Sequence, residues 1–580
     1  PEPDDPQQPG DFAQRWDPIV RKLNPEYSMR MMMDMVGERG KPCFLSYVEG
    51  ANLGTFQVEI DERVPEAVRV GAVRHVENKA YADIWCSFPS RKSEPRFASL
   101  MVGSVQVNSF KIDTRINPDN SLEGHAELAL ESRSNQDRAV TFELSRFLKI
   151  TGARDNEGRP LTLFQNPSGV EPETVRRATD WFLVVLPRPY PAGEKFKLEF
   201  SYQGNVIADA GNGVLLVGER SSWYPNRGLL QRSDFDLRFH YPERLTLVAT
   251  GERVEESAAD GWKHSRWVSR HPQAVAGFNL GVYRSRERRV GGFTIEVFAT
   301  REVEAAIEKR NLTIQPMTEV IGRVLPNPGA PITTLARAGT PLDPAALLDS
   351  VADVASESLS RYEELYGPLP VSRLAITQVP GHFGQGWPGL VYLPTMSFLP
   401  KAERLRLGLD SRPEEFANEL TLAHEIAHQW WGNNVGWLTY RDQWLSEGFA
   451  SYSAALQLAA GKDGERKLRE LLRSYKTHLL AKTPRGTTVE SGGPMLLGQR
   501  LSNSLNPEGY TGVIYKKACW VIHMLRALMA DGAPGREERF FRMLRDFITA
   551  YQGKHPSTRD FIRHAEKYMT RPMDLERNQR

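Results

Sequence analysis

Two histidines and two glutamates have the residue types and the spacing that hydrolytic metal chemistry needs. In the stretch His424-Glu425-Ile-Ala-His428 the histidines are four residues apart, so on a helix both imidazoles point to one side and can reach one metal ion. Glu447, 19 residues further on, can supply a third ligand and leave the fourth tetrahedral position for water. Glu425 stays free to take a proton from that water. The pattern predicts zinc-assisted hydrolysis with one zinc ion per chain.

These side chains must be positioned by a helix and by a second segment. Residues 414–431 are predicted to form the helix, because apolar residues recur there at helical spacing: Phe416, Leu420, Ala423 and Ala427. An amphipathic helix with two buried, hydrogen-bonded histidines is the alternative. The second segment, DQWLSEGFA at 442–450, places Glu447 in a mostly apolar stretch. An unpartnered charge is costly there, and a metal ion is an adequate partner.

The stretches HEIAHQWWGN and WLSEGFA resemble the gluzincin aminopeptidases, the family of aminopeptidase N and leukotriene hydrolase. The usual family forms are HExxHxWxGN and WLNEGFA. The resemblance implies that the zinc ligands are His424, His428 and Glu447, and that Glu425 is the general base. Ser446 stands where asparagine is common, a change that we expect to leave metal binding intact.

A downstream stretch, from Tyr510 to Cys519, is similar to the family segment that ends in YEKGA. The resemblance implies that Tyr515 stabilises the tetrahedral oxyanion, because a phenol O–H donates a hydrogen bond where negative charge develops. The alternative role for Tyr515 is that of a half-buried helix tyrosine packed on Val513 or Ala518. Tyr510 matches a second tyrosine of the family, and we expect it to contact substrate.

The sequence departs from the family at the stretch that binds the free α-amine of a substrate. Family aminopeptidases use the glutamate of a GxMEN motif, and the equivalent stretch here is GQGWPGLVY at 384–392. The shared tail sets a register in which Gly386 replaces that glutamate, while Gln385 offers only a neutral amide. Both residues are predicted to lie at the substrate. The stretch also satisfies the dinucleotide pattern GxGxxG, but a strand follows it instead of a helix, so we expect a glycine-rich edge strand that lines a cleft.

Four functions therefore remain open. The first is an aminopeptidase-like zinc metallopeptidase acting on a peptide substrate, and the second is a short-peptide endopeptidase. The third is a hydrolase for a non-peptide substrate such as an epoxide, and the fourth is a non-catalytic binding protein. The intact base, ligand set and Tyr515 argue against the fourth.

The predicted fold class is α+β with several domains. Residues 1–99 are expected to be a β-rich N-terminal extension that packs against the next domain. Residues 100–289 are expected to form an antiparallel β domain, since stretches such as Val105–Ile112 and Lys195–Phe200 alternate apolar and polar residues. Ser222–Pro225 resembles the WFP of the family, but the Cys-x-Asp-Glu-Pro that follows it there is missing, so substrate contacts around it are expected to be rebuilt.

Residues 290–580 are expected to form a thermolysin-like catalytic domain. Pro326–Pro331 marks a loop, and Asp343-Pro344 begins a helix that ends at Gly367. Further helices are predicted around 447–458 and 515–530. Between them 484–509, rich in Gly, Pro and Ser, is predicted to be a long loop near the cleft.

Composition excludes several other classes. Lys and Arg total 74 against 72 for Asp and Glu, which gives no electrostatic case for binding nucleic acid or an anionic membrane. No stretch reaches the 18 or so apolar residues needed to span a bilayer. The start at Pro1 favours an exported protein as an expectation, without fixing the compartment or the oligomeric state. Of the three cysteines, Cys43 and Cys86 either pair or stay reduced.

Overall fold

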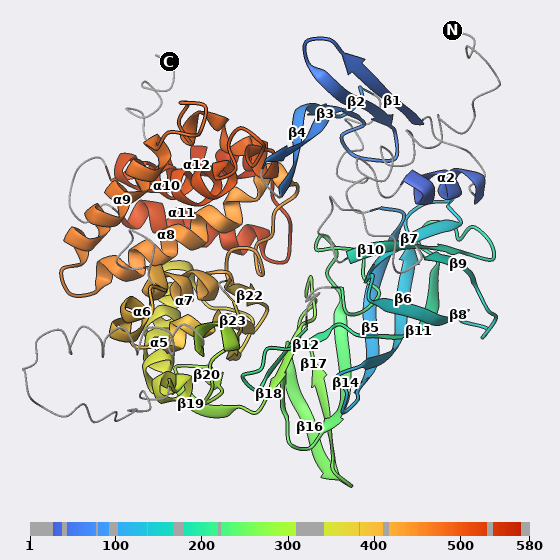
Figure 1. Ribbon diagram of the computed structural model, residues 1–580, viewed down its shortest axis with the longest axis horizontal. Helices are drawn as coiled ribbons and strands as arrows, with labels where there is room; N and C mark the ends of the chain where they lie inside the picture. The colour runs from blue at the N-terminus through green and yellow to red at the C-terminus, as the bar shows by residue number, and fades with distance from the viewer. Residues whose placement is uncertain are drawn as a thin grey trace, which may run out of the picture.

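The structure is a computed structural model that describes residues 27–36, 43–76, 79–91, 103–135, 137–165, 179–217, 222–308, 342–381, 383–409, 417–530 and 537–569. Sheets occupy the N-terminal half of the chain and helices dominate the C-terminal half, which confirms the α+β prediction (Figure 1). The predicted loop at 326–331 and the start of the zinc helix, 414–416, lie outside the described residues.

The first described part is a helix followed by an antiparallel meander. The helix is α2 (Tyr27–Val36), and the meander, in sheet order, is β1 (Cys43–Gly50), β2 (Gly54–Asp61), β3 (Val68–Val76) and β4 (Lys79–Phe88). Cys43 lies in β1 and Cys86 in β4, so three strand spacings, about 14 Å, separate them. That distance is too long for a disulfide, and both cysteines are free.

The second part is built on a seven-stranded sheet in the order β16-β17-β14-β5-β6-β11-β8. Its inward-facing residues alternate along the strands, and their side chains form one large apolar core with Trp223 and Tyr224 inside it. The strands are β5 (Val105–Ile116), β6 (Leu122–Ser132), β8 (Leu148–Asp155), β11 (Lys195–Gly204), β14 (Asp234–Pro242), β16 (Glu252–Ala259) and β17 (Trp262–Val268).

Two smaller sheets complete this part. One has the order β7-β10-β9 and the other the order β12-β13-β18-β15. Their strands are β7 (Ala139–Ser145), β9 (Thr162–Gln165), β10 (Thr179–Val185), β12 (Ile207–Asp209), β13 (Val214–Val217), β15 (Thr246–Ala249) and β18 (Phe278–Gly281). The strands predicted at 105–112 and 195–200 are both present.

The third part begins with a mixed five-stranded sheet in the order β19-β20-β21-β23-β22. Its strands are β19 (Arg284–Val290), β20 (Phe293–Ala299), β21 (Arg373–Val379), β22 (Gln385–Trp387) and β23 (Leu390–Pro394). The proposed domain boundary between 289 and 290 falls inside β19. Strand β22 is the edge strand, paired only with β23, and helix α7 (Ala417–Ala427) packs on both of them.

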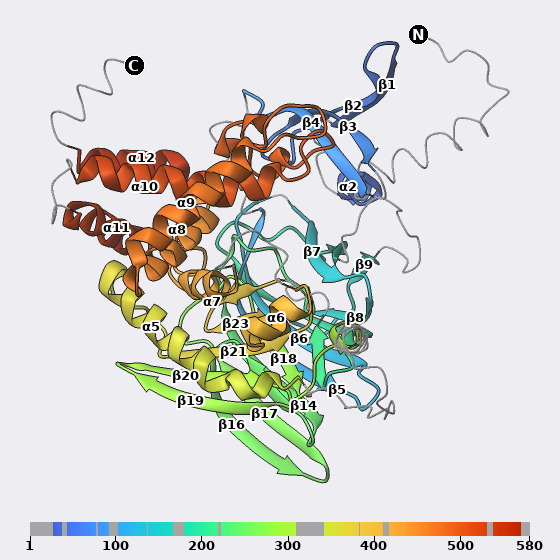
Figure 2. The same ribbon diagram turned by 60° about the vertical axis from the view of Figure 1, so that its left-hand side comes forward.

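Helices cover this sheet and continue beyond it (Figures 1 and 2). Asp343 caps a 3-10 turn, Pro344–Leu347, that runs into α5 (Leu348–Tyr366), and the helix ends at Gly367, as predicted. The other helices are α6 (Lys401–Arg406), α8 (Trp444–Ala460), α9 (Gly464–Leu480), α10 (Ala518–Met529), α11 (Glu538–Tyr551) and α12 (Thr558–Glu566). No helix among the described residues is long and apolar enough to cross a bilayer.

The predicted loop 484–509 contains short 3-10 turns at Glu490–Gly492 and Met495–Leu501. After it, the helix predicted at 515–530 starts as a π-helical segment, Thr511–Lys517, and continues as α10. Such π-helical segments are rare in proteins, and those that occur are frequently found at functional sites. This one carries Tyr515.

Candidate metal centre

Three side chains from two adjacent helices converge on one point. His424 lies in the last turn of α7, His428 follows one residue after that helix ends, and Glu447 lies in the first turn of α8, which packs on α7. Their ligand atoms all lie within 4.8 Å of one another, and in the described part of the chain this is the one such group of three. The helical spacing therefore brings the predicted ligands together.

The separations fit a tetrahedral metal ion. The Nε2 atoms of the two histidines are 3.1 Å apart, and the Glu447 Oε2 atom lies 3.3 Å from His424 Nε2 and 3.5 Å from His428 Nε2. Zinc bonds of roughly 2.0–2.1 Å at tetrahedral angles place ligand atoms about 3.3 Å apart. The donor set, two imidazoles and one carboxylate, is also one that zinc prefers.

Neighbouring groups hold the His428 ring in the orientation that a ligand needs. Its Nδ1–H donates to the carbonyl oxygen of Trp431 at 2.9 Å, so the Nε2 lone pair faces the other ligands. Ser446 donates to the same carbonyl oxygen at 3.1 Å. The serine that replaces the family asparagine thus supports the ring of a ligand, which sequence reasoning did not predict.

Charge within the group is balanced even without an ion. Burial opposes ionisation of Glu447, but the two histidines outweigh it and hold its pKa well below the ordinary value. Burial also opposes protonation of His428, but Glu447 raises the pKa of that imidazole to about 9. A metal ion must therefore displace a proton from His428.

Glu425 is buried beside the ligands and is not one of them. Burial raises the pKa of its carboxyl group, and the nearby histidines only partly offset this. The backbone N–H of Gly386 donates a hydrogen bond to the carboxylate. A positioned carboxyl group with a raised pKa suits a group that both takes and returns a proton.

Tyr515 lies beside the metal group, and its role at the oxyanion stays a prediction. Its ring stacks on His424 with centroids 5.7 Å apart, and its hydroxyl donates to Glu447. Burial and the charge of Glu447 raise its pKa well above the ordinary value, so the phenol stays protonated and remains a donor. Tyr510 packs edge-on against Tyr515 and hydrogen-bonds to it and to Gln443.

Strand β22 lies directly on the zinc helix. The Gln429 side chain donates to the Trp387 carbonyl oxygen and accepts from the Gly389 N–H, both at 2.9 Å. Asn433 donates to the Gly386 carbonyl oxygen at 3.0 Å. Sequence reasoning missed these two clamping residues, although both belong to the quoted HEIAHQWWGN stretch.

This packing explains the glycines of the stretch. A β-carbon on Gly386 would lie 2.4 Å from the Glu425 carbonyl oxygen and 2.8 Å from His428 Cβ, and one on Gly384 would lie 2.4 Å from Glu425 Oε1. Glycine is thus required at these positions because the strand approaches the metal-ligand helix and its next residue so closely. Both polar backbone groups of Gly386 are used inside the protein, so its contact with substrate stays a prediction, as does that of Gln385.

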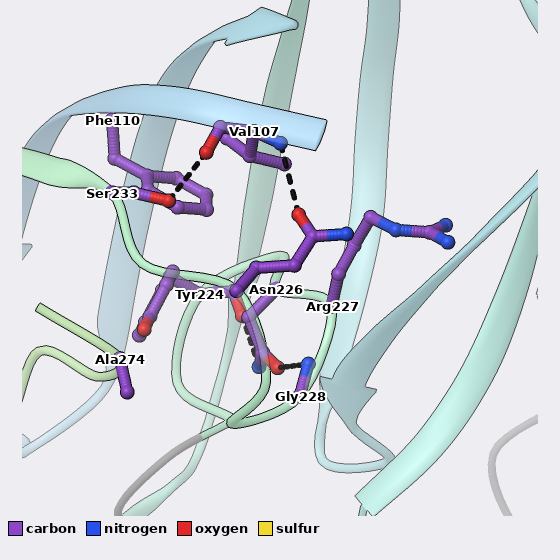
Figure 3. A pocket seen from close by; sticks show the side chains of 9 residues that line it. Val107, Phe110, Tyr224, Asn226, Arg227, Gly228, Ser233 and Ala274 are labelled. Atoms are coloured by element: carbon purple, nitrogen blue, oxygen red, sulfur yellow. Dashed lines mark hydrogen bonds between the residues drawn. The ribbon is translucent and has the colours of Figure 1, made fainter. Parts of the chain in front are cut away.

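Trp223 and Tyr224 lie in the core of the β domain. A cavity there is lined by Tyr224, Asn226, Arg227 and Ser233, among others (Figure 3). Its volume is about 10 Å³, enough for about one water molecule. Ser233 and Asn226 already bond to backbone groups there. The cavity is therefore too small for a substrate.

Comparisons with known proteins agree with the site. Residues 408–577 match the Peptidase family M1 domain. Aminopeptidase O of Rattus norvegicus is 30% identical over 223 residues, which are 35% of this chain and 25% of that protein. Human endoplasmic reticulum aminopeptidase 1 is 32% identical over 108 residues, 18% of this chain and 11% of that protein. The chain thus matches a quarter or less of the length of these relatives.

The fold has a counterpart among solved structures. The M1 zinc metallopeptidase from Deinococcus radiodurans superposes with a TM-score of 0.54 and 18% identity, covering 81% of this chain and 93% of that one. The chain therefore shares the fold of that structure, and its His424, His428 and Glu447 form a group that could hold a metal ion. In sequence, residues 408–577 are similar to the M1 peptidase family domain.

Proposed function

We propose that this protein is a zinc metallopeptidase that hydrolyses peptide bonds with Glu425 as general base. The observation that carries the proposal is the convergence of His424, His428 and Glu447 at tetrahedral spacing. Zinc held by these three residues would lower the pKa of a bound water to about 7 and would polarise the scissile carbonyl.

The protein's own residues carry the protons. Glu425 accepts the proton of the attacking water and delivers one to the leaving amine, a double role that its raised pKa supports. The Gly386 N–H fixes the Glu425 carboxylate. Tyr515 turns its O–H from Glu447 to the oxyanion, where a donor contributes most because the charge develops in the transition state.

The relatives named above support an aminopeptidase-like activity, since they are aminopeptidases. A specific observation favours a second candidate, a short-peptide endopeptidase. Position 386 has neither the amine-binding glutamate nor space for any side chain, and its backbone groups are already bonded. An enzyme of this second kind does not require a free α-amine on its substrate.

A peptide-library digest separates these candidates. Zinc-loaded protein is incubated with matched libraries whose N-termini are free or acetylated, and the products are read by mass spectrometry. Loss of single N-terminal residues from the free library alone supports the aminopeptidase. Internal cleavage of both libraries supports the endopeptidase. Absence of cleavage in both, with zinc bound, contradicts peptide hydrolysis.

A further inference from the structure

The sheet β1–β4 and helix α2 together contact both the β domain and the C-terminal helical part. Next to the sheet, α2 buries Met29 against Ala139 and Leu183 of the β domain, and Arg30 of the same helix donates to Asp61 of β2 at 2.7 Å. At the other end, β4 lies beside the C-terminal helical part (Figures 1 and 2). The sheet and α2 therefore bridge the β domain and the part of the chain that carries the metal group.

Glu66, in the connection between β2 and β3, is the centre of the contact with the helical part. Its Oε1 accepts from Arg441 Nε at 2.7 Å, and its Oε2 accepts from the Tyr440 hydroxyl at 2.8 Å. Ser87 of β4 donates to the same carboxylate, and Arg441 donates to the Ser87 carbonyl oxygen at 3.0 Å. Burial opposes ionisation, yet these donors hold the pKa of Glu66 below its ordinary value. A carboxylate that accepts several hydrogen bonds contributes more to stability than an ion pair on the solvated surface does.

A second set of contacts holds the segment between α9 and the π-helical segment. Asp83 of β4 accepts from the Ser504 N–H at 2.7 Å and from the Ser504 hydroxyl, and Arg500 donates to the Ile84 carbonyl oxygen at 3.1 Å. The turn that contains Tyr440 and the segment that contains Ser504 are also in close contact with each other. At Gly498, where φ is +51°, a β-carbon would lie 2.2 Å from the Tyr440 carbonyl oxygen.

Both segments lead directly to the metal group. Tyr440 and Arg441 belong to the 3-10 turn before α8, and the carbonyl oxygen of Gln443, the residue after that turn, accepts from the Glu447 N–H at 3.1 Å. The Gln443 side chain hydrogen-bonds to Tyr510, which hydrogen-bonds to Tyr515. A continuous set of contacts thus runs from Glu66 to the tyrosine at the oxyanion position.

We propose that the sheet β1–β4 is a brace that holds Tyr510 and Tyr515 at the metal group, with Glu66 as its main positioning residue. The proposal rests on the proposed function for its kinetic readout. The brace loosens when Glu66 loses its charge, because Arg441 and Tyr440 then lose an ionised acceptor. Zinc content is expected to stay unchanged when the brace loosens, since all three ligands lie on α7, α8 and the residue after α7.

The test compares Glu66→Gln with Glu49→Gln, an exposed glutamate of β1 that serves as matched control. Two quantities are measured on the full chain: amide hydrogen exchange over 495–515, and peptide hydrolysis at equal zinc content. Glu66→Gln is expected to speed exchange in that segment and to lower kcat about tenfold, with KM nearly unchanged. Asp83→Asn, which weakens the Ser504 contact and the ion pair with Arg74, is expected to act in the same direction and serves if Glu66→Gln does not fold.

Exchange over 495–515 that matches the Glu49→Gln control overturns the brace, whatever the turnover. A fall in zinc content that accounts for the whole loss of kcat also overturns it. If no form of the protein cleaves peptides, the proposed function fails, but the exchange measurement still tests the brace. A double-mutant cycle with Arg441→Gln is expected to give less than additive effects, because both residues belong to one network.

Discussion

Gly386 lies so close to Glu425 that a β-carbon on it would sit 2.4 Å from the glutamate's carbonyl oxygen. The obstacle is a helix backbone, which cannot rotate away as a side chain can. The glycine therefore does more than omit the amine-binding glutamate: it lets an edge strand rest on the helix that carries two metal ligands. Its N–H in turn fixes the carboxylate of the proposed general base.

Gly386→Ala is expected to lower the free energy of unfolding by about 1–3 kcal/mol, because the added methyl group overpacks the contact between β22 and α7. It is also expected to weaken zinc binding, since His428 Cβ is the next nearest atom. Urea unfolding and zinc titration check both effects. Gly292→Ala is the control, because a β-carbon there meets nothing within 4 Å. Equal stability of the two variants would show that β22 does not rest on α7.

Tyr515→Phe is expected to keep one zinc per chain and to lower kcat by about 10²- to 10³-fold, the effect of removing one oxyanion donor. KM should change little, because the hydroxyl acts on charge that develops after binding. Steady-state kinetics on a cleaved peptide check this. Tyr551→Phe in α11, whose ring packs on Phe547, is the control. If kcat falls no more than twofold, the role of Tyr515 is packing and not oxyanion stabilisation.

Zinc affinity is expected to rise with pH. The pKa of His428 in the metal-free protein is raised to about 9, so below that pH a proton must leave before the imidazole can bind metal. The apparent association constant should therefore increase about tenfold per pH unit between roughly pH 6.5 and 8.5. Competition with a chromophoric chelator measures it. An affinity independent of pH over this range would contradict the raised pKa of His428.

The convergence of the three candidate metal ligands could be predicted from the sequence. His424 and His428 converge because of helical periodicity, and the apolar surroundings of Glu447 marked it as a charge in need of a partner. The strands at 105–112 and 195–200 were equally predictable, because burial on one face imposes alternation. The ends of one helix were likewise predictable from Asp343, Pro344 and Gly367, since helix caps depend on residues close together in the sequence.

Contacts between distant segments could not be predicted in the same way. The contact of Gly386 with α7 depends on how closely a strand approaches a helix some 40 residues away. The bonds of Glu66 to Tyr440 and Arg441 join segments about 375 residues apart. Nothing in the residues 511–517 indicated a π-helical segment, a rare structure for which no sequence signal was recognised.

The central claim is that Glu425 moves the proton of a water at the His424–His428–Glu447 site. Peptide turnover by zinc-loaded Glu425→Gln, measured beside its zinc content, tests it most directly. His428→Ala serves as the control that loses the metal itself. The expected result is one zinc per chain and turnover lowered by at least about 10²- to 10⁴-fold. Near-normal turnover by Glu425→Gln with zinc bound would contradict the claim.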